Sequence, residues 1–220
     1  MSGLCTSAPV GLTLQVIAVS LLLQLLVGGA IGWQLARRRW AGNAWLDVLV
    51  TLPLVFPPIV LGYALLLLLG RNGWLLQGLP AWLQPDLVFT PAGLVLAAFV
   101  AGLPLMVKPT QTAFASTSPR LREAAAVLGH TPWQIFWRIE LPLARRGLAA
   151  GLILAGGRAL GEVGLSLMLG GNIVGRTETL SLAIFNQVLD GNLDCANQLS
   201  LLLCGLAIPI FLMLRRLGAV

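Results

Sequence analysis

The sequence predicts an all-α membrane protein: a polytopic helical bundle of five transmembrane helices, with the N-terminus outside and the C-terminus inside. Of its 220 residues, 57% are hydrophobic and only 10% are charged, whereas a soluble domain carries about 25% charged residues. The chain has five apolar runs, and about 20 apolar residues are enough for a helix to cross a bilayer. Basic residues gather at alternate ends of these runs, as they do in integral membrane proteins.

The first apolar run has no charged residue before Arg37, where three consecutive arginines would hold its end in the cytoplasm. A cleaved signal peptide is the competing interpretation, but it needs a basic start and an apolar run of about 7–15 residues. Because this start lacks lysine and arginine and the run is longer, we expect a permanent helix. The chain should form one transmembrane domain, 1–220, with spans over about residues 11–36, 48–70, 87–108, 147–169 and 196–214.

Three prolines interrupt the second span, namely Pro53, Pro57 and Pro58. A proline removes a backbone donor and strains a helix, and lipid cannot satisfy the carbonyls that are left unpaired. We therefore expect a kinked or broken helix that packs inside protein. Broken helices often line a substrate route, so these prolines are candidates for a translocation path. A kink that only shapes the bundle is the alternative.

The fourth span carries two ionisable residues, Arg158 and Glu162. Charges inside a bilayer are costly and usually face the bundle interior as pairs, and a spacing of four residues allows the two side chains to pair within one helix. They are candidates for the translocation path. A purely structural pair that holds helices together is the alternative.

The distribution of arginines predicts the orientation of the bundle. In the proposed topology only Arg71 and Arg176 lie in outside loops. The loop from Gly170 to Asn197 is also expected outside, with a short amphipathic helix over Thr179–Leu189. Ten arginines fall on the inside: Arg37, Arg38, Arg39, Arg120, Arg122, Arg138, Arg145, Arg146, Arg215 and Arg216. This asymmetry is the positive-inside pattern.

Several functional classes lack support in the sequence. The net charge is +6, but its position at the ends of apolar runs favours a membrane over a nucleic-acid partner. The three cysteines show no Cys-x-x-Cys spacing and His130 is the single histidine, so we expect neither a metal site nor a disulfide framework. No Gly-x-x-x-x-Gly-Lys-Ser/Thr motif for nucleotide binding is present. We therefore expect no catalytic residues and no cofactor bound by this chain.

The long polar segment over residues 118–142 has the signals of two short amphipathic helices on the cytoplasmic side. Ser118 is placed to cap the first helix, and a glycine at 129 is placed to end it in a left-handed conformation. Thr131 and Gln134 have the spacing of a capping box at the start of the second helix. Pro142 is expected to end that helix, because the residue before a proline avoids the α region.

This segment resembles the EAA loop of ABC-importer permeases, E-A-A-x3-G-x9-I-x-L-P. Every fixed position of that motif has its counterpart at the matching spacing: Glu123, Ala124, Ala125, Gly129, Ile139, Leu141 and Pro142. The proline-rich stretch 52–63 and the stretches 158–164 and 171–180 resemble molybdate permeases, and the likeness extends over about residues 11–216. The resemblance implies a type I ABC-importer permease fold in the cytoplasmic (inner) membrane of a prokaryote.

The resemblance also implies partners and a function. The chain would be a non-catalytic permease subunit in contact with membrane lipid, forming a homodimer with a second copy of itself. ATP-binding subunits would dock on the EAA-like residues as the coupling surface and would use ATP and magnesium themselves. An extracytoplasmic binding protein would deliver a tetrahedral oxyanion, with molybdate expected and tungstate or sulfate as alternatives.

Two functions of other classes are the alternatives to a permease subunit. A secondary transporter or channel without an ATPase is expected to show internal repeats or several ionisable groups at the midplane. A membrane-embedded enzyme needs a nucleophile–base or metal constellation. The sequence has neither repeats nor such a constellation, and Arg158 and Glu162 are the ionisable residues of the spans.

Overall fold

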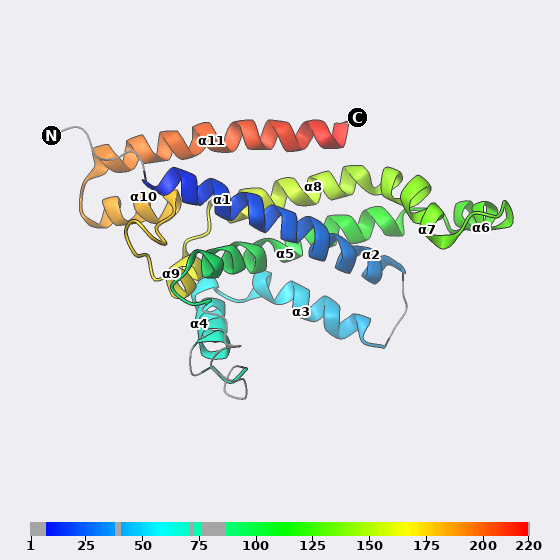
Figure 1. The fold of residues 1–220 in the computed structure, drawn as a ribbon, viewed down its shortest axis with the longest axis horizontal. Coiled ribbons are helices and arrows are strands. Elements are labelled where there is room, and N and C mark those ends of the chain that lie inside the picture. Colours follow the sequence, from blue (N-terminus) through cyan, green and yellow to red (C-terminus); the bar gives the residue numbers. More distant parts are fainter. Residues whose placement is uncertain (1–7, 38–40, 71–72, 76–86, 220) are drawn as a thin grey trace.

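The computed structural model describes residues 8–37, 41–70, 73–75 and 87–219, and within these ranges every regular element is a helix (Figure 1). Three helices are long and apolar enough to cross a membrane, and a bent fourth segment qualifies if its two parts are counted together. The predicted stop at Arg38 and Arg39 and the outside position of Arg71 fall outside the described residues.

The first rod of the bundle joins α1 (Ala8–Leu23), the π-helical turn η1 (Gln24–Gly28) and α2 (Gly29–Arg37). A π-turn is a rare insertion that is frequent at functional sites. Gln24 opens this turn and is completely buried. Its side-chain amide donates to the carbonyl of Ala98 at 3.1 Å, so a polar contact ties the first rod to α5 (Pro91–Ala115).

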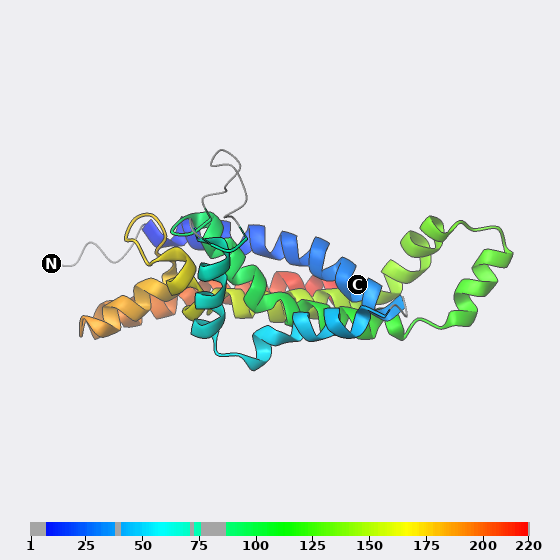
Figure 2. The same ribbon diagram turned by 90° about the horizontal axis from the view of Figure 1, so that it is seen from below.

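The proline-rich second span is broken into α3 (Asn43–Val55) and α4 (Pro58–Leu69). Phe56 and Pro57 between them are extended, with ψ of 144° and 136°, because a residue that precedes a proline is driven out of the α region. The break predicted from the prolines is therefore present, and α4 runs steeply away from the direction of α3 (Figures 1 and 2).

Helix α5 forms the centre of the bundle. Its buried side is built largely from small residues, among them Ala97, Ala98, Ala101 and Gly102. It packs against the first rod and against α8 (Leu141–Leu160), α9 (Gly164–Gly170) and α3. Small residues let the backbones of membrane helices approach closely.

The polar segment contains α6 (Pro119–Val127), α7 (Pro132–Ile135) and the π-helical turn η3 (Phe136–Glu140), and it extends beyond the end of the bundle (Figure 2). The prediction that Pro142 ends the second helix is wrong, because the chain passes from η3 directly into α8. In η3 the amide of Leu141 bonds to the carbonyl of Phe136, five residues back. This wide turn shifts the hydrogen-bond register just before Pro142, which then stands in the first turn of α8, where a proline is tolerated.

A bend of 63° separates α8 from α9. The chain then forms α10 (Leu180–Leu189) and the long α11 (Leu193–Ala219), which packs on α8 and α10. Most of the apolar window of α11 is exposed, since only 6% of it is buried. Cys195 at the start of α11 is disulfide-bonded, whereas no disulfide framework is expected from the sequence.

Candidate functional site

The turn between α6 and α7 has a fixed shape. Gly129 adopts a φ of 86° in the left-handed region. Its amide donates to the carbonyl of Ala126 at 3.0 Å, and the amide of His130 donates to the carbonyl of Ala125 at 3.1 Å. These two bonds form a Schellman motif, which closes the carboxyl end of a helix. The left-handed cap expected from the sequence is therefore present.

The second helix begins with the predicted capping box. The backbone amide of Gln134 donates to the hydroxyl of Thr131 at 3.3 Å, and the amide of Thr131 donates to the side-chain oxygen of Gln134 at 3.0 Å. Ser118 stands at the N-cap of α6, but its side chain makes no capping bond. The predicted cap by its hydroxyl is therefore wrong, and the start of α6 relies on Pro119 at its first position.

The residues of the EAA-like motif divide into two groups. Glu123 and Ala124 are exposed on α6 and Gly129 is exposed at the turn, whereas Ala125 is buried. Ile139, Leu141 and Pro142 lie at the base of the segment, where η3 passes into α8. The tip also exposes apolar side chains, with Val127 at 87%, Leu128 at 79% and Trp133 at 68%. Large exposed apolar patches occur at surfaces that contact another protein or a membrane.

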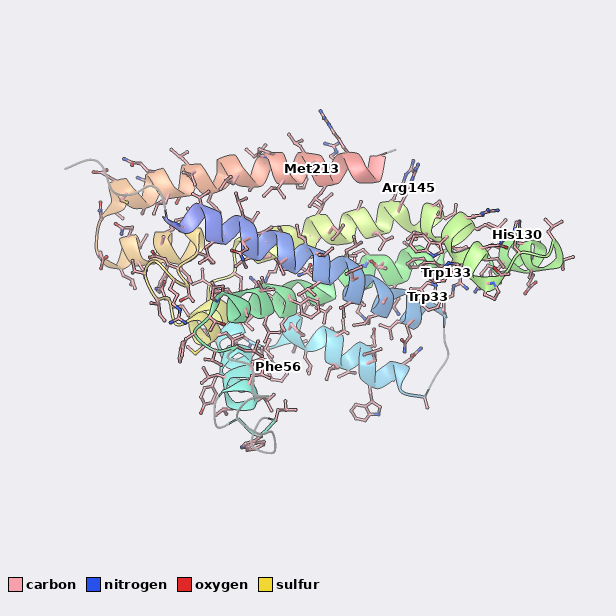
Figure 3. The ribbon with its side chains drawn as sticks, viewed as in Figure 1. Trp33, Phe56, His130, Trp133, Arg145 and Met213 are labelled. Atoms are coloured by element: carbon pink, nitrogen blue, oxygen red, sulfur yellow. The ribbon has the colours of Figure 1, made fainter. Side chains whose placement is uncertain are left out.

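A cluster of aromatic rings fixes the base of the segment to the bundle. Phe136 of η3 stacks on Phe114 of α5 at 6.2 Å and meets the ring of Trp33 of α2 edge-on at 5.7 Å. Trp133 and Trp137 contact the same ring, at 6.1 and 5.4 Å. Together with leucines of η1 and α8 these rings line a groove of about 580 Å³. Trp33 and Trp133 lie near each other at this place (Figure 3). The segment is thus anchored to the first rod and to α5.

Glu140 makes polar contacts beside these rings and is only 2% exposed. Its carboxylate accepts a hydrogen bond from the indole N–H of Trp33 at 3.2 Å. The same carboxylate forms an ion pair with Arg37. The EAA-like motif does not identify Glu140, because this residue occupies the variable position of I-x-L-P. No spacing rule in the sequence connects Glu140 with Trp33 and Arg37, which lie more than a hundred residues earlier.

The two broken helices meet at a second candidate site. A Cβ atom on Gly164 of α9 would lie 2.8 Å from Cβ of Pro58, and one on Gly62 would lie 2.7 Å from Cβ of Met168. Distances this short are possible only because both positions are glycine. Pro57 is exposed in the break, and Pro53 lies within α3 about one turn earlier. The structure thus brings Pro58 to the start of α9.

The predicted pair in the fourth span is formed at the junction of α8 and α9. Nη1 of Arg158 lies 2.6 Å from Oε2 of Glu162. The other oxygen of Glu162 accepts the backbone amide of Leu165 at 2.8 Å. The side chain of Glu162 is 1% exposed and that of Arg158 is 32% exposed. The carboxylate therefore holds the start of α9 and the guanidinium together.

The chain is similar to the membrane components of known transport systems. The family model described as binding-protein-dependent transport system inner membrane component matches residues 13–217. The molybdenum transport system permease protein of Azotobacter vinelandii is 40% identical over 181 residues, 82% of this chain and 80% of the relative. The corresponding protein of Haemophilus influenzae is 36% identical over 177 residues, 80% of this chain and 77% of the relative.

A more distant relative is the sulfate transport system permease protein CysW of Synechocystis. It is 32% identical over 197 residues, which are 90% of this chain and 71% of the relative. Among solved structures, a bacterial alginate ABC transporter in complex with an alginate pentasaccharide-bound periplasmic protein matches with a TM-score of 0.74 at 22% identity, over 96% of this chain and 79% of that one. At this identity the likeness shows the fold alone.

Proposed function

Because the chain belongs to the family of binding-protein-dependent transport system inner membrane components, we propose that it is the permease of an ATP-driven importer for a tetrahedral oxyanion. Molybdate is the proposed substrate. The relatives named for molybdenum transport are 36–40% identical to this chain, whereas the CysW relative from Synechocystis is 32% identical. Sulfate and tungstate are the alternative oxyanions.

The proposed orientation has five spans, with the broken α3–α4 segment counted as one, the N-terminus outside and the C-terminus inside. Two observations support it. Arginines lie in the last turns of α2 and α11 and in α6, at the end of the bundle that carries the polar segment (Figure 1). Cys195, near the opposite end, is disulfide-bonded, and disulfides persist in the oxidising space outside the cytoplasm.

The proposed assembly contains two copies of this chain, two ATP-binding subunits and an extracytoplasmic binding protein. Two-fold symmetry is by far the commonest symmetry of homo-oligomers. A translocation path between two copies of this chain would lie along that axis. The exposed tip of α6 and α7, with Val127, Leu128 and Trp133, supports docking of an ATPase subunit. ATP and magnesium would be used by that subunit, and this chain would transmit motion without catalysis.

The single observation that carries the proposal is the rigid connection between the tip and the spans. The Schellman turn and capping box fix α6 against α7, while Phe136 and Glu140 fix η3 to α2 and α5. Movement of docked ATPase subunits would therefore turn the rod and α8 as rigid bodies. The proposed translocation path runs past the helix breaks at Pro57 and Glu162, since such breaks border substrate routes in transporters.

Co-purification and competition test this proposal. The permease expressed with its ATPase partner should recover that subunit from detergent, and excess unlabelled molybdate should suppress uptake of labelled oxyanion more strongly than sulfate does. A permease that is recovered alone and transports in response to an ion gradient would instead be a secondary transporter.

A further inference from the structure

The two side chains of the Arg158–Glu162 pair differ in their exposure. Glu162 is almost completely enclosed and uses both carboxylate oxygens, one on Arg158 and one on the amide of Leu165. Arg158 keeps 32% of its side chain exposed, and Nη1 is its atom in the ion pair. A guanidinium has five N–H donors in a planar fork. Donors of Arg158 therefore remain directed away from the carboxylate.

Two glycines close to Arg158 in the sequence have open space around them. A Cβ atom placed on Gly157 would meet no atom within 4 Å beyond its own chain neighbours, and one on Gly161 would meet only the carbonyl of Gly157, at 3.8 Å. Leu154, one turn earlier on α8, is 49% exposed. Glycine lets a ligand approach the backbone closely. An arginine in such a setting can be reached by a small ligand.

A purely structural role does not explain this arrangement. Ionisable residues within membrane spans usually face the bundle interior or a water-filled cavity. Glu162 makes the contact that fixes the start of α9, because its carboxylate accepts the backbone amide of Leu165. The exposed part of Arg158 contributes nothing to that contact, and its hydration would be lost in a membrane without a further partner.

We propose that Arg158 contacts the oxyanion during transit and that Glu162 is its positioning residue. This inference rests on the proposed function. A doubly charged tetrahedral anion would accept hydrogen bonds from the free edge of the guanidinium, which suits planar, bidentate recognition of oxyanions. Glu162 keeps the empty site close to neutral, so the anion is held weakly enough to leave. A site that conducts must bind in this balanced way.

The test uses a variant that keeps the pair neutral. In Arg158→Gln/Glu162→Gln the two amides can bond to each other and the second still accepts the amide of Leu165, so the complex should assemble. The complete complex is reconstituted in proteoliposomes with its binding protein, and uptake of radiolabelled molybdate is measured beside the yield of assembled complex. Loss of a charged hydrogen bond should lower uptake about tenfold or more, with the Kd of the binding protein unchanged.

A matched pair of glycine variants tests whether the open space at Gly157 is needed for uptake. Gly157→Leu fills the open space at the residue before Arg158, while Gly205→Leu fills equally open space on α11, where a Cβ also meets no atom within 4 Å. Uptake should be slower for the Gly157 variant and equal to wild type for the Gly205 variant. Wild-type uptake by the double Gln variant overturns this inference alone. Failure of the wild-type complex to transport any tetrahedral oxyanion overturns the proposed function and the inference with it.

Discussion

Glu140, the last residue of η3, forms an ion pair with Arg37, the last residue of α2. The contact joins the base of the polar segment to the end of the first rod, across more than a hundred residues of sequence. Trp33 donates its indole N–H to the same carboxylate at 3.2 Å. Both partners of the ion pair are largely shielded from water. The contact should therefore hold the polar segment and the first rod together when a docked subunit moves.

Glu140→Ala should therefore destabilise the protein. The change leaves Arg37 without its partner in a shielded position, and breaking a buried pair costs about 3–5 kcal/mol. Thermal unfolding of the purified permease in detergent measures the effect. Glu123→Ala is the matched control, because Glu123 is exposed on α6 and surface changes stay within about 0.5 kcal/mol. Equal unfolding temperatures for the two variants would contradict this role of the ion pair.

Gly129→Val should weaken recovery of the ATPase subunit in a pull-down. A Cβ at this position would meet no atom within 4 Å, so the penalty comes only from its φ of 86°. A left-handed conformation costs an ordinary residue about 1–2 kcal/mol, and a β-branched residue tolerates it least. Gly129→Asn is the control, since asparagine adopts this conformation more readily. Recovery that is equally good for the valine and asparagine variants would exclude a role for the turn geometry.

Gly102→Ala should disturb the contact between the first rod and α5. The added Cβ would lie 2.2 Å from Nε2 of Gln24, whose amide donates to Ala98. Overpacking of this kind costs about 1–3 kcal/mol. Shortening the side chain with Gln24→Ser in the same protein should restore part of the lost stability. Gly205→Ala, in open space, serves as the control. Losses that simply add in the double variant would show that the two residues do not touch.

Thr131→Val should lower stability by about 1 kcal/mol, because it removes the capping oxygen from the start of α7. Ser118→Ala, by contrast, should have little effect, since the hydroxyl of Ser118 makes no capping bond. Unfolding midpoints in detergent compare the two directly. A larger loss for the serine variant would reverse the assignment of the caps.

The features that could be predicted from the sequence are those set by local chemistry. Prolines 57 and 58 indicated the break in the second span, and Gly129 and Thr131 indicated the turn and the cap. The failure at Pro142 also has a local cause, since a π-turn inserted before it moves the hydrogen-bond register. The helix before this turn, α7, has only four residues, which are too few for apolar periodicity to reveal the shift.

The contacts that tie distant elements together could not be predicted in this way. Gln24 and Glu140 are isolated polar residues whose partners lie 74 and 107 positions away. No spacing rule connects them. The pairing of Arg158 with Glu162 was expected from their four-residue separation, but the bend that follows and the closeness of Gly164 to Pro58 depend on how four helices pack.

The most direct test of the central claim is uptake by the complete complex in proteoliposomes, with ATP supplied on the side of the polar segment. The account predicts that labelled molybdate enters only when ATP, magnesium, the ATPase subunits and the binding protein are all present. It also predicts that a hydrolysis-deficient ATPase subunit abolishes uptake. Molybdate uptake that continues with this inactive subunit, or without ATP, would contradict a permease driven through its cytoplasmic loop.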